Sequence, residues 1–202
     1  MILELIILLL PLYISAILEK KTIKAEFKEI GFFRGLKGTF TVVLRIILGV
    51  DIGIFLYFFA RLFLFLYKDI LIIYLFGTQF VEEGVSNSIS TEPIHPNFLE
   101  ITLIIILQVL ITSPSEEGFF RGFLIQKFNR KLKLKYTVVI SSTFFAFYHV
   151  PPFLVPLSTI ITYFGYYFLL GFLLTLIFIY SNKSLLMCII SHSVFNILIL
   201  VI

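Results

Sequence analysis

Long uninterrupted runs of apolar residues constrain this chain more than any other feature of its sequence. Several of them approach or exceed the roughly 20 residues that an α-helix needs to cross a bilayer. Hydrophobic residues make up 59% of the chain and charged residues only 14%, so lipid is expected to be the solvent for much of its surface. Helices and closed barrels alone satisfy the backbone in lipid, and these runs are continuous rather than alternating. The sequence therefore predicts an all-α, polytopic transmembrane helical bundle.

Six membrane spans are predicted, at 2–18, 40–66, 98–126, 136–150, 156–180 and 184–202. The first run lacks a basic leader and an evident cleavage site, so we interpret it as a retained span rather than a signal peptide. The segment 67–80 has two interpretations. It is either a short interfacial or re-entrant piece, or the second half of a helical hairpin turning near Arg61, which would give seven spans.

The basic residues gather in two of the loops. Segment 19–38 carries six Lys and Arg residues and segment 127–135 carries five, whereas segment 81–97 carries none and has three glutamates. The positive-inside rule places the two basic loops in the cytoplasm and the acidic loop outside. This arrangement favours a single crossing between residues 39 and 80, and hence six spans with the N-terminus outside.

The stretch SPSEEGFFRG places three charges inside apolar sequence. Glu117 and Arg121 are four residues apart, so on a helix they share a face and are expected to form an ion pair. Glu116 points about 100° away from that pair and has no basic partner on its own segment. A structural alternative exists for Glu116, because Ser113 to Glu116 fits a capping box with Pro114 at the first position of a new helix.

Two histidines and an asparagine also lie in apolar runs of the same half of the chain. His149 follows Phe145 by one helical turn, and Asn196 follows His192 by one turn, so each pair shares a helix face. Such histidines can simply hydrogen-bond a backbone carbonyl, but ionisable groups inside a membrane are functional candidates by default. Glu116, His149 and His192 lie roughly 16, 21 and 14 Å from the basic end of their helices. Their similar depth predicts that the three side chains meet.

A carboxylate, two imidazoles and a carboxamide in a membrane cavity favour hydrolysis. The carboxylate can act as general base toward water, and one histidine can share that task or protonate the leaving amine. The second histidine and the asparagine can donate hydrogen bonds to a developing oxyanion. Alternatively, Glu116, His149 and His192 form a three-ligand zinc site with an open position. The spacing leaves open whether a metal is bound.

The chain resembles the CPBP intramembrane proteases, also called the CAAX-protease and bacteriocin-processing or Abi family, which include the type II CAAX prenyl endopeptidases. Three motifs carry the resemblance, in the family's order: EEGFFR fits E-E-x-x-x-R, FAFYH fits F-x-x-x-H and HSVFN fits H-x-x-x-N. The resemblance covers residues 98–202, the expected catalytic core, and 1–97 forms an N-terminal transmembrane region with loops. Together they make one integral membrane domain.

The resemblance implies a multi-pass intramembrane endopeptidase whose cavity opens to the cytoplasm. In it, Glu116 and His149 activate water, His192 and Asn196 stabilise the oxyanion, and the remaining motif residues, Glu117, Arg121 and Phe145, support them. The expected partners are the lipid bilayer and a peptide or membrane-protein substrate, and nucleic acid is not expected. No cofactor is expected, with zinc as the alternative. Two other functions stay open, a non-catalytic bacteriocin-immunity or scaffold protein and a transporter.

Overall fold

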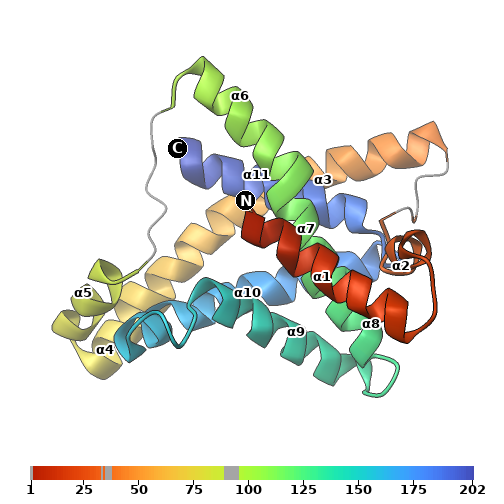
Figure 1. Ribbon diagram of the computed structural model, residues 1–202. Helices are drawn as coiled ribbons and strands as arrows, with labels where there is room; N and C mark the ends of the chain where they lie inside the picture. Colours follow the sequence, from red (N-terminus) through yellow and green to blue (C-terminus); the bar gives the residue numbers. More distant parts are fainter. Residues whose placement is uncertain (1, 33, 35–37, 89–95) are drawn as a thin grey trace.

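The computed structural model describes residues 2–32, 34, 38–88 and 96–202 (Figure 1), and it contains no strand within those ranges. The helices are α1 (Ile2–Leu18), α2 (Ile23–Glu29), α3 (Thr39–Leu64), α4 (Ile73–Phe76), α5 (Thr78–Ser86), α6 (Phe98–Leu107), α7 (Ser113–Glu117), α8 (Ile125–Phe128), α9 (Leu134–His149), α10 (Leu157–Tyr180) and α11 (Leu185–Val201). Three π-helical segments, whose wider turns accommodate an extra residue, lie at Phe65–Ile72, Gln108–Thr112 and Gly118–Leu124. The predicted all-α class is confirmed.

Within the described ranges, three helices are long and apolar enough to cross a membrane: Thr39–Phe76, Phe98–Phe128 and Leu157–Tyr180. Two shorter apolar helices, Leu3–Leu18 and Leu185–Val201, coincide with the predicted first and last spans. The predicted span at 136–150 corresponds to α9, which has 16 residues. The count of six spans stays a prediction.

Segment 67–80, which the sequence left open, mostly continues the helix that begins at Thr39. The helix passes Arg61 without a turn and ends at Phe76, where Gly77 adopts a φ of +87° that suits a residue without a Cβ. The hairpin interpretation is therefore wrong. Helix α5 begins directly after this glycine and includes the start of the predicted outer loop, of which residues 89–95 lie outside the described residues.

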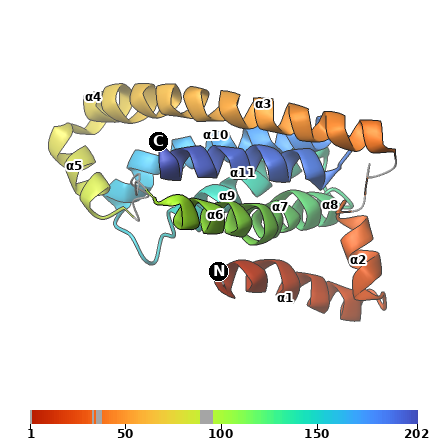
Figure 2. The same cartoon turned by 90° about the horizontal axis from the view of Figure 1, so that it is seen from above.

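Helix α3 packs along α11 through two glycines (Figure 2). A Cβ on Gly53 would lie only 2.7 Å from the Ser191 carbonyl oxygen, and one on Gly49 would lie 2.8 Å from the Cβ of Ile190. The absence of side chains at these two positions lets the backbones approach closely, as in many membrane helix pairs. Helix α11 contacts α7 as well as α3, and this contact brings the His192 motif to the SPSEE turn.

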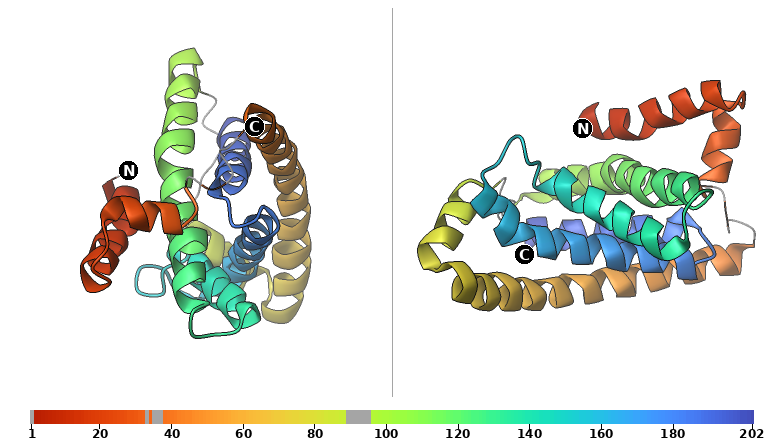
Figure 3. Two further views of the ribbon diagram at one scale, coloured as in Figure 1. Left: turned by 90° about the vertical axis from the view of Figure 1, so that its right-hand side faces the viewer. Right: turned by 90° about the horizontal axis from the view of Figure 1, so that it is seen from below.

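Helix α1 lies on the opposite side of the bundle from α3 (Figure 3). Its residues Leu8 and Leu12 are buried and pack with Ile30, which follows α2. Carboxylates and basic side chains from the turn after α1, from α2, and from α8 and the turn that follows it form an ion-pair cluster. Its members are Glu19, Lys21, Glu26, Glu29, Lys127 and Arg130. The cluster ties the α1–α2 arm to the helix that carries the SPSEE turn.

Acid is expected to loosen this arm. Hydrogen bonds from Arg130, Lys127 and Lys21 hold the pKa of the Glu19 carboxyl well below its usual range. A carboxyl with a depressed folded-state pKa stabilises the fold above its unfolded pKa of about 4.3 and loses that contribution as pH falls toward the folded value. Hydrogen exchange in α1, corrected for the intrinsic pH dependence, should therefore rise between pH 7 and pH 3 more than exchange in α10. Equal changes in the two helices would contradict the anchoring role of Glu19.

Candidate active site

The SPSEE turn, α7, lies between two π-helical segments of one continuous helix. Thr112 keeps right-handed helical backbone angles and does not cap the turn, and the Ser113 hydroxyl makes no hydrogen bond within the described chain. The Ser113 amide bonds back to the Gln108 carbonyl, and this wide turn accommodates Pro114, which has no N–H to donate. The capping-box interpretation is wrong, because no new helix begins at Pro114 and Glu116 has nothing to cap.

Glu117 and Arg121 are completely buried and form an ion pair. The Arg121 Nη1 donates to Glu117 Oε1 at 2.9 Å, and its Nη2 donates to the Gly171 carbonyl at 3.2 Å. The guanidinium also lies 4.3 Å from the centre of the Phe145 ring, close enough for a cation–π contact. Because removing two charges from water is costly, this close geometry and these extra contacts are what make the burial tolerable.

Glu117 has a second partner that sequence spacing could not indicate, because it lies on another helix. His192 Nδ1 lies 2.6 Å from Glu117 Oε1, and both side chains are buried. An ionised carboxylate only accepts hydrogen bonds, so the Nδ1 of His192 carries the proton. The Glu117–Arg121 pair therefore fixes the ring orientation of His192 and turns its Nε2 toward Glu116.

His149 is oriented by the backbone of its own helix. Its Nδ1 lies 2.9 Å from the Phe145 carbonyl, which can only accept, so Nδ1 is the donor and Nε2 keeps its lone pair in the neutral ring. The imidazole stacks on the Tyr167 ring with centroids 4.5 Å apart and packs against Phe145 at 4.4 Å. These contacts hold Nε2 of His149 toward Glu116.

The structure brings Glu116, His149 and His192 together from three helices. Glu116 Oε2 lies 3.9 Å from His149 Nε2 and 3.8 Å from His192 Nε2, too far for direct hydrogen bonds. This oxygen is buried and makes no hydrogen bond within the described chain. The His149 side chain is 23% exposed and the other two at most 6%, so access to the group is from the His149 side. Two imidazole nitrogens and a free carboxylate oxygen can together hold and deprotonate a water.

Asn196 lies one turn beyond His192, and its Nδ2 donates to Gln108 Oε1 at 3.0 Å. Gln108 also accepts a bond from the Ser193 hydroxyl through its backbone carbonyl. One N–H of Asn196 is thus engaged, and the second is available to a ligand. The contact with Gln108 was not predicted; an amide within the apolar run before Pro114 is the sequence signal that could have indicated it.

A further carboxylate approaches the site from α1. Tyr148 directly precedes His149 in the sequence, and its hydroxyl donates to Glu4 Oε1 at 2.8 Å. Sequence reasoning gave Glu4 no role in the site. The signal that could have found it is a lone acidic residue in the first apolar run.

The distances between the candidate ligand atoms decide whether zinc fits this site. Zinc holds nitrogen and oxygen ligands at about 2.0–2.2 Å, so any two of them lie within about 4.4 Å of each other. In the described part of the chain, the three carboxylates of the ion-pair cluster alone offer three ligand atoms within 4.8 Å, and they already pair with lysine and arginine. The Nε2 atoms of His149 and His192, which both face Glu116, lie more than 4.8 Å apart. As placed, the three side chains therefore do not fit zinc, and the zinc alternative stays a prediction.

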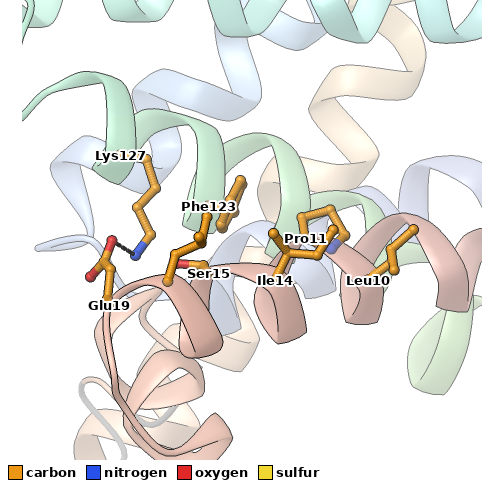
Figure 4. A pocket seen from close by; sticks show the side chains of 8 residues that line it. Leu10, Pro11, Ile14, Ser15, Glu19, Phe123 and Lys127 are labelled. Carbon is orange, nitrogen blue, oxygen red and sulfur yellow. Dashed lines mark hydrogen bonds and ion pairs between the residues drawn. The ribbon is translucent and has the colours of Figure 1, made fainter.

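A groove of about 430 Å³ lies between α1 and the helix that carries the SPSEE turn (Figure 4). Leu10, Pro11 and Ile14 line it from α1 and Phe123 from the facing helix, and the Lys127–Glu19 ion pair lies at one end. Its lining does not include Glu116. The groove is therefore separate from the space in which water would be activated.

Comparison with known proteins gives one match. A family model described as "Type II CAAX prenyl endopeptidase Rce1-like" matches residues 98–198, which is 101 of the 202 residues. No curated protein and no solved structure matches the chain. The matched region contains the residues from Glu116 to Asn196, whereas α1, α2 and Glu4 lie outside it.

Proposed function

The chain belongs to the type II CAAX prenyl endopeptidase Rce1-like family. We propose that it hydrolyses peptide bonds inside the membrane with water activated by Glu116. One observation carries the proposal. Glu116 Oε2 is buried, makes no hydrogen bond within the described chain, and lies 3.8–3.9 Å from the Nε2 atoms of His149 and His192. A buried carboxylate oxygen left without a partner in this way needs a ligand, and water is the ligand that hydrolysis requires.

In the first step, a water held between Glu116 and His149 attacks the carbonyl carbon of the peptide bond. Its proton passes to Glu116 Oε2, while the lone pair on His149 Nε2 accepts the second hydrogen and orients the water. The carbon–oxygen bond forms as the carbonyl becomes an oxyanion. No covalent bond to the protein is needed.

The oxyanion requires hydrogen-bond donors. His192 can donate from Nε2 only as an imidazolium, because its Nδ1 proton is already committed to Glu117. The Glu117 carboxylate favours that charged ring, and the free N–H of Asn196 would provide a second donor. Glu116 then returns its proton to the leaving nitrogen as the carbon–nitrogen bond breaks. The products are a new carboxyl terminus and a new amine.

We propose CAAX-type processing near the cytoplasmic face as the activity to test first. The family description names prenyl endopeptidases, and the basic loops at 19–38 and 127–135 favour a cytoplasmic position for the end of the bundle that they flank. Glu116 lies roughly 16 Å along its helix from the second of these loops. A substrate with its cleavage site close to that face could reach it.

The test uses purified protein in liposomes and two peptides ending in a CAAX sequence, one with a prenylated cysteine and one without. Wild type is expected to release the terminal tripeptide from the prenylated form and to keep its rate after strict chelation. A rate abolished by chelation and restored by zinc would support the zinc site instead. No cleavage of either peptide would contradict the CAAX-type assignment.

A further inference from the structure

Glu4 contributes a carboxylate to the active site from outside the family-matched region. Its Oε1 accepts the hydrogen bond of Tyr148, and its Oε2 is buried without a hydrogen bond in the described part of the chain. Tyr148 directly precedes His149, and the rings of these two residues are in perpendicular contact with their centres 5.3 Å apart. Glu4 is therefore held by a side chain that packs on the imidazole facing Glu116.

The packing of α1 and Tyr148 fixes the position of Glu4. One turn after Glu4, the buried Leu8 packs so closely on Gly118 that a Cβ there would lie 2.7 Å from Leu8 Cδ1. The centre of the Tyr148 ring lies 5.7 Å from that of Phe120 and 5.3 Å from that of His149, and the His149 ring is nearly perpendicular to it. The hydrogen bond to Glu4 thus joins two packed elements rather than a loose helix end.

The charges around this carboxylate do not balance. Glu117 pairs with Arg121, and the imidazolium proposed for His192 lies 3.8 Å from Glu116. Glu4, by contrast, has no lysine or arginine within ion-pair distance among the described residues, and its bond is to the uncharged Tyr148. A carboxylate such as that of Glu4, with one buried oxygen that lacks a hydrogen bond and no positive charge beside it, is costly, and its potential favours a cationic ligand. The neutral form of His149, whose Nδ1 is bonded to a carbonyl, does not supply that charge.

We propose that Glu4 binds a basic side chain of the peptide substrate beside the scissile bond, with Tyr148 holding its carboxylate in place. The inference rests on the proposed function and adds a preference to it. The chain would favour substrates with lysine or arginine next to the cleaved bond.

The test uses prenylated CAAX peptides that are identical except for lysine or norleucine beside the scissile bond. Wild type, Glu4→Gln, Tyr148→Phe and the matched control Glu82→Gln, an exposed position on α5, are compared in liposomes. For both wild type and Glu82→Gln, the KM for the lysine peptide is expected to be at least tenfold lower than the KM for the norleucine peptide. Glu4→Gln should abolish that difference by raising KM for the lysine peptide, and Tyr148→Phe should reduce it.

Four outcomes would overturn the proposal. Equal KM values for the two peptides in wild type, or a lysine preference that survives in Glu4→Gln, would remove the role of Glu4 while leaving the proposed hydrolysis intact. Cleavage of neither peptide by wild type would remove both. If Glu4→Gln does not fold, Tyr148→Phe decides, because an undiminished preference in that variant contradicts the proposal.

Discussion

Replacing Glu116 with glutamine is expected to lower the rate of peptide hydrolysis by about 10²–10⁴-fold, the usual contribution of a general base. Glutamine keeps the shape of the side chain but cannot accept the proton of the attacking water. Glu116 Oε2 makes no hydrogen bond within the described chain, so the exchange removes no structural contact there. The loss should therefore appear in kcat, without a decrease in the free energy of unfolding.

The measurement compares kcat and thermal unfolding of Glu116→Gln, wild type and Glu82→Gln in the same detergent. Glu82 is exposed on α5, so its exchange for glutamine makes the same chemical change away from the site. Retained hydrolysis in Glu116→Gln would rule out the general-base role. A biological phenotype that persists in this variant without any hydrolysis would favour the immunity or scaffold function.

Replacing Arg121 with leucine is expected to destabilise the fold by about 3–5 kcal/mol, the usual cost of leaving one charge of a buried pair uncompensated. Arg121 is fully buried and donates to both Glu117 and the Gly171 carbonyl. Without Arg121, Glu117 retains only His192 as a partner. Arg121 then no longer holds the Glu117 carboxylate in place, so the orientation of the His192 imidazole is less well fixed. Activity should fall together with stability.

A double-mutant cycle separates the ion pair from simple loss of packing. The variant Arg121→Leu with Glu117→Gln should recover part of the lost unfolding free energy, because no charge is then left buried without a partner. Denaturant unfolding in detergent measures the four free energies. Strictly additive losses would show that the two side chains do not interact and would contradict the pairing.

What the sequence could predict follows from spacing along one helix. The four-residue separation of Glu117 and Arg121 predicts their contact, and the depths of Glu116, His149 and His192 predict that they meet. Both follow from the geometry of a regular helix and the position of charged loops. The catalytic roles of these residues stay predictions until activity is measured.

What spacing could not predict depends on neighbours that are distant in the chain. The bond from His192 to Glu117 requires the rotation of one helix against another, which the glycine contacts between α3 and α11 help to set. Helix continuity through Pro114 requires a π-helical turn that has no distinctive sequence pattern. The contact of Tyr148 with Glu4 spans 144 residues of the chain.

The most direct test of the central claim is ¹⁸O incorporation at new carboxyl termini. Membranes carrying wild type or Glu116→Gln would be incubated in H₂¹⁸O with the prenylated CAAX peptide and analysed by mass spectrometry. If Glu116 activates water for peptide hydrolysis, wild-type membranes will produce a cleaved peptide with ¹⁸O in its new carboxylate and Glu116→Gln membranes will not. Equal amounts of labelled product from both membranes would contradict the claim.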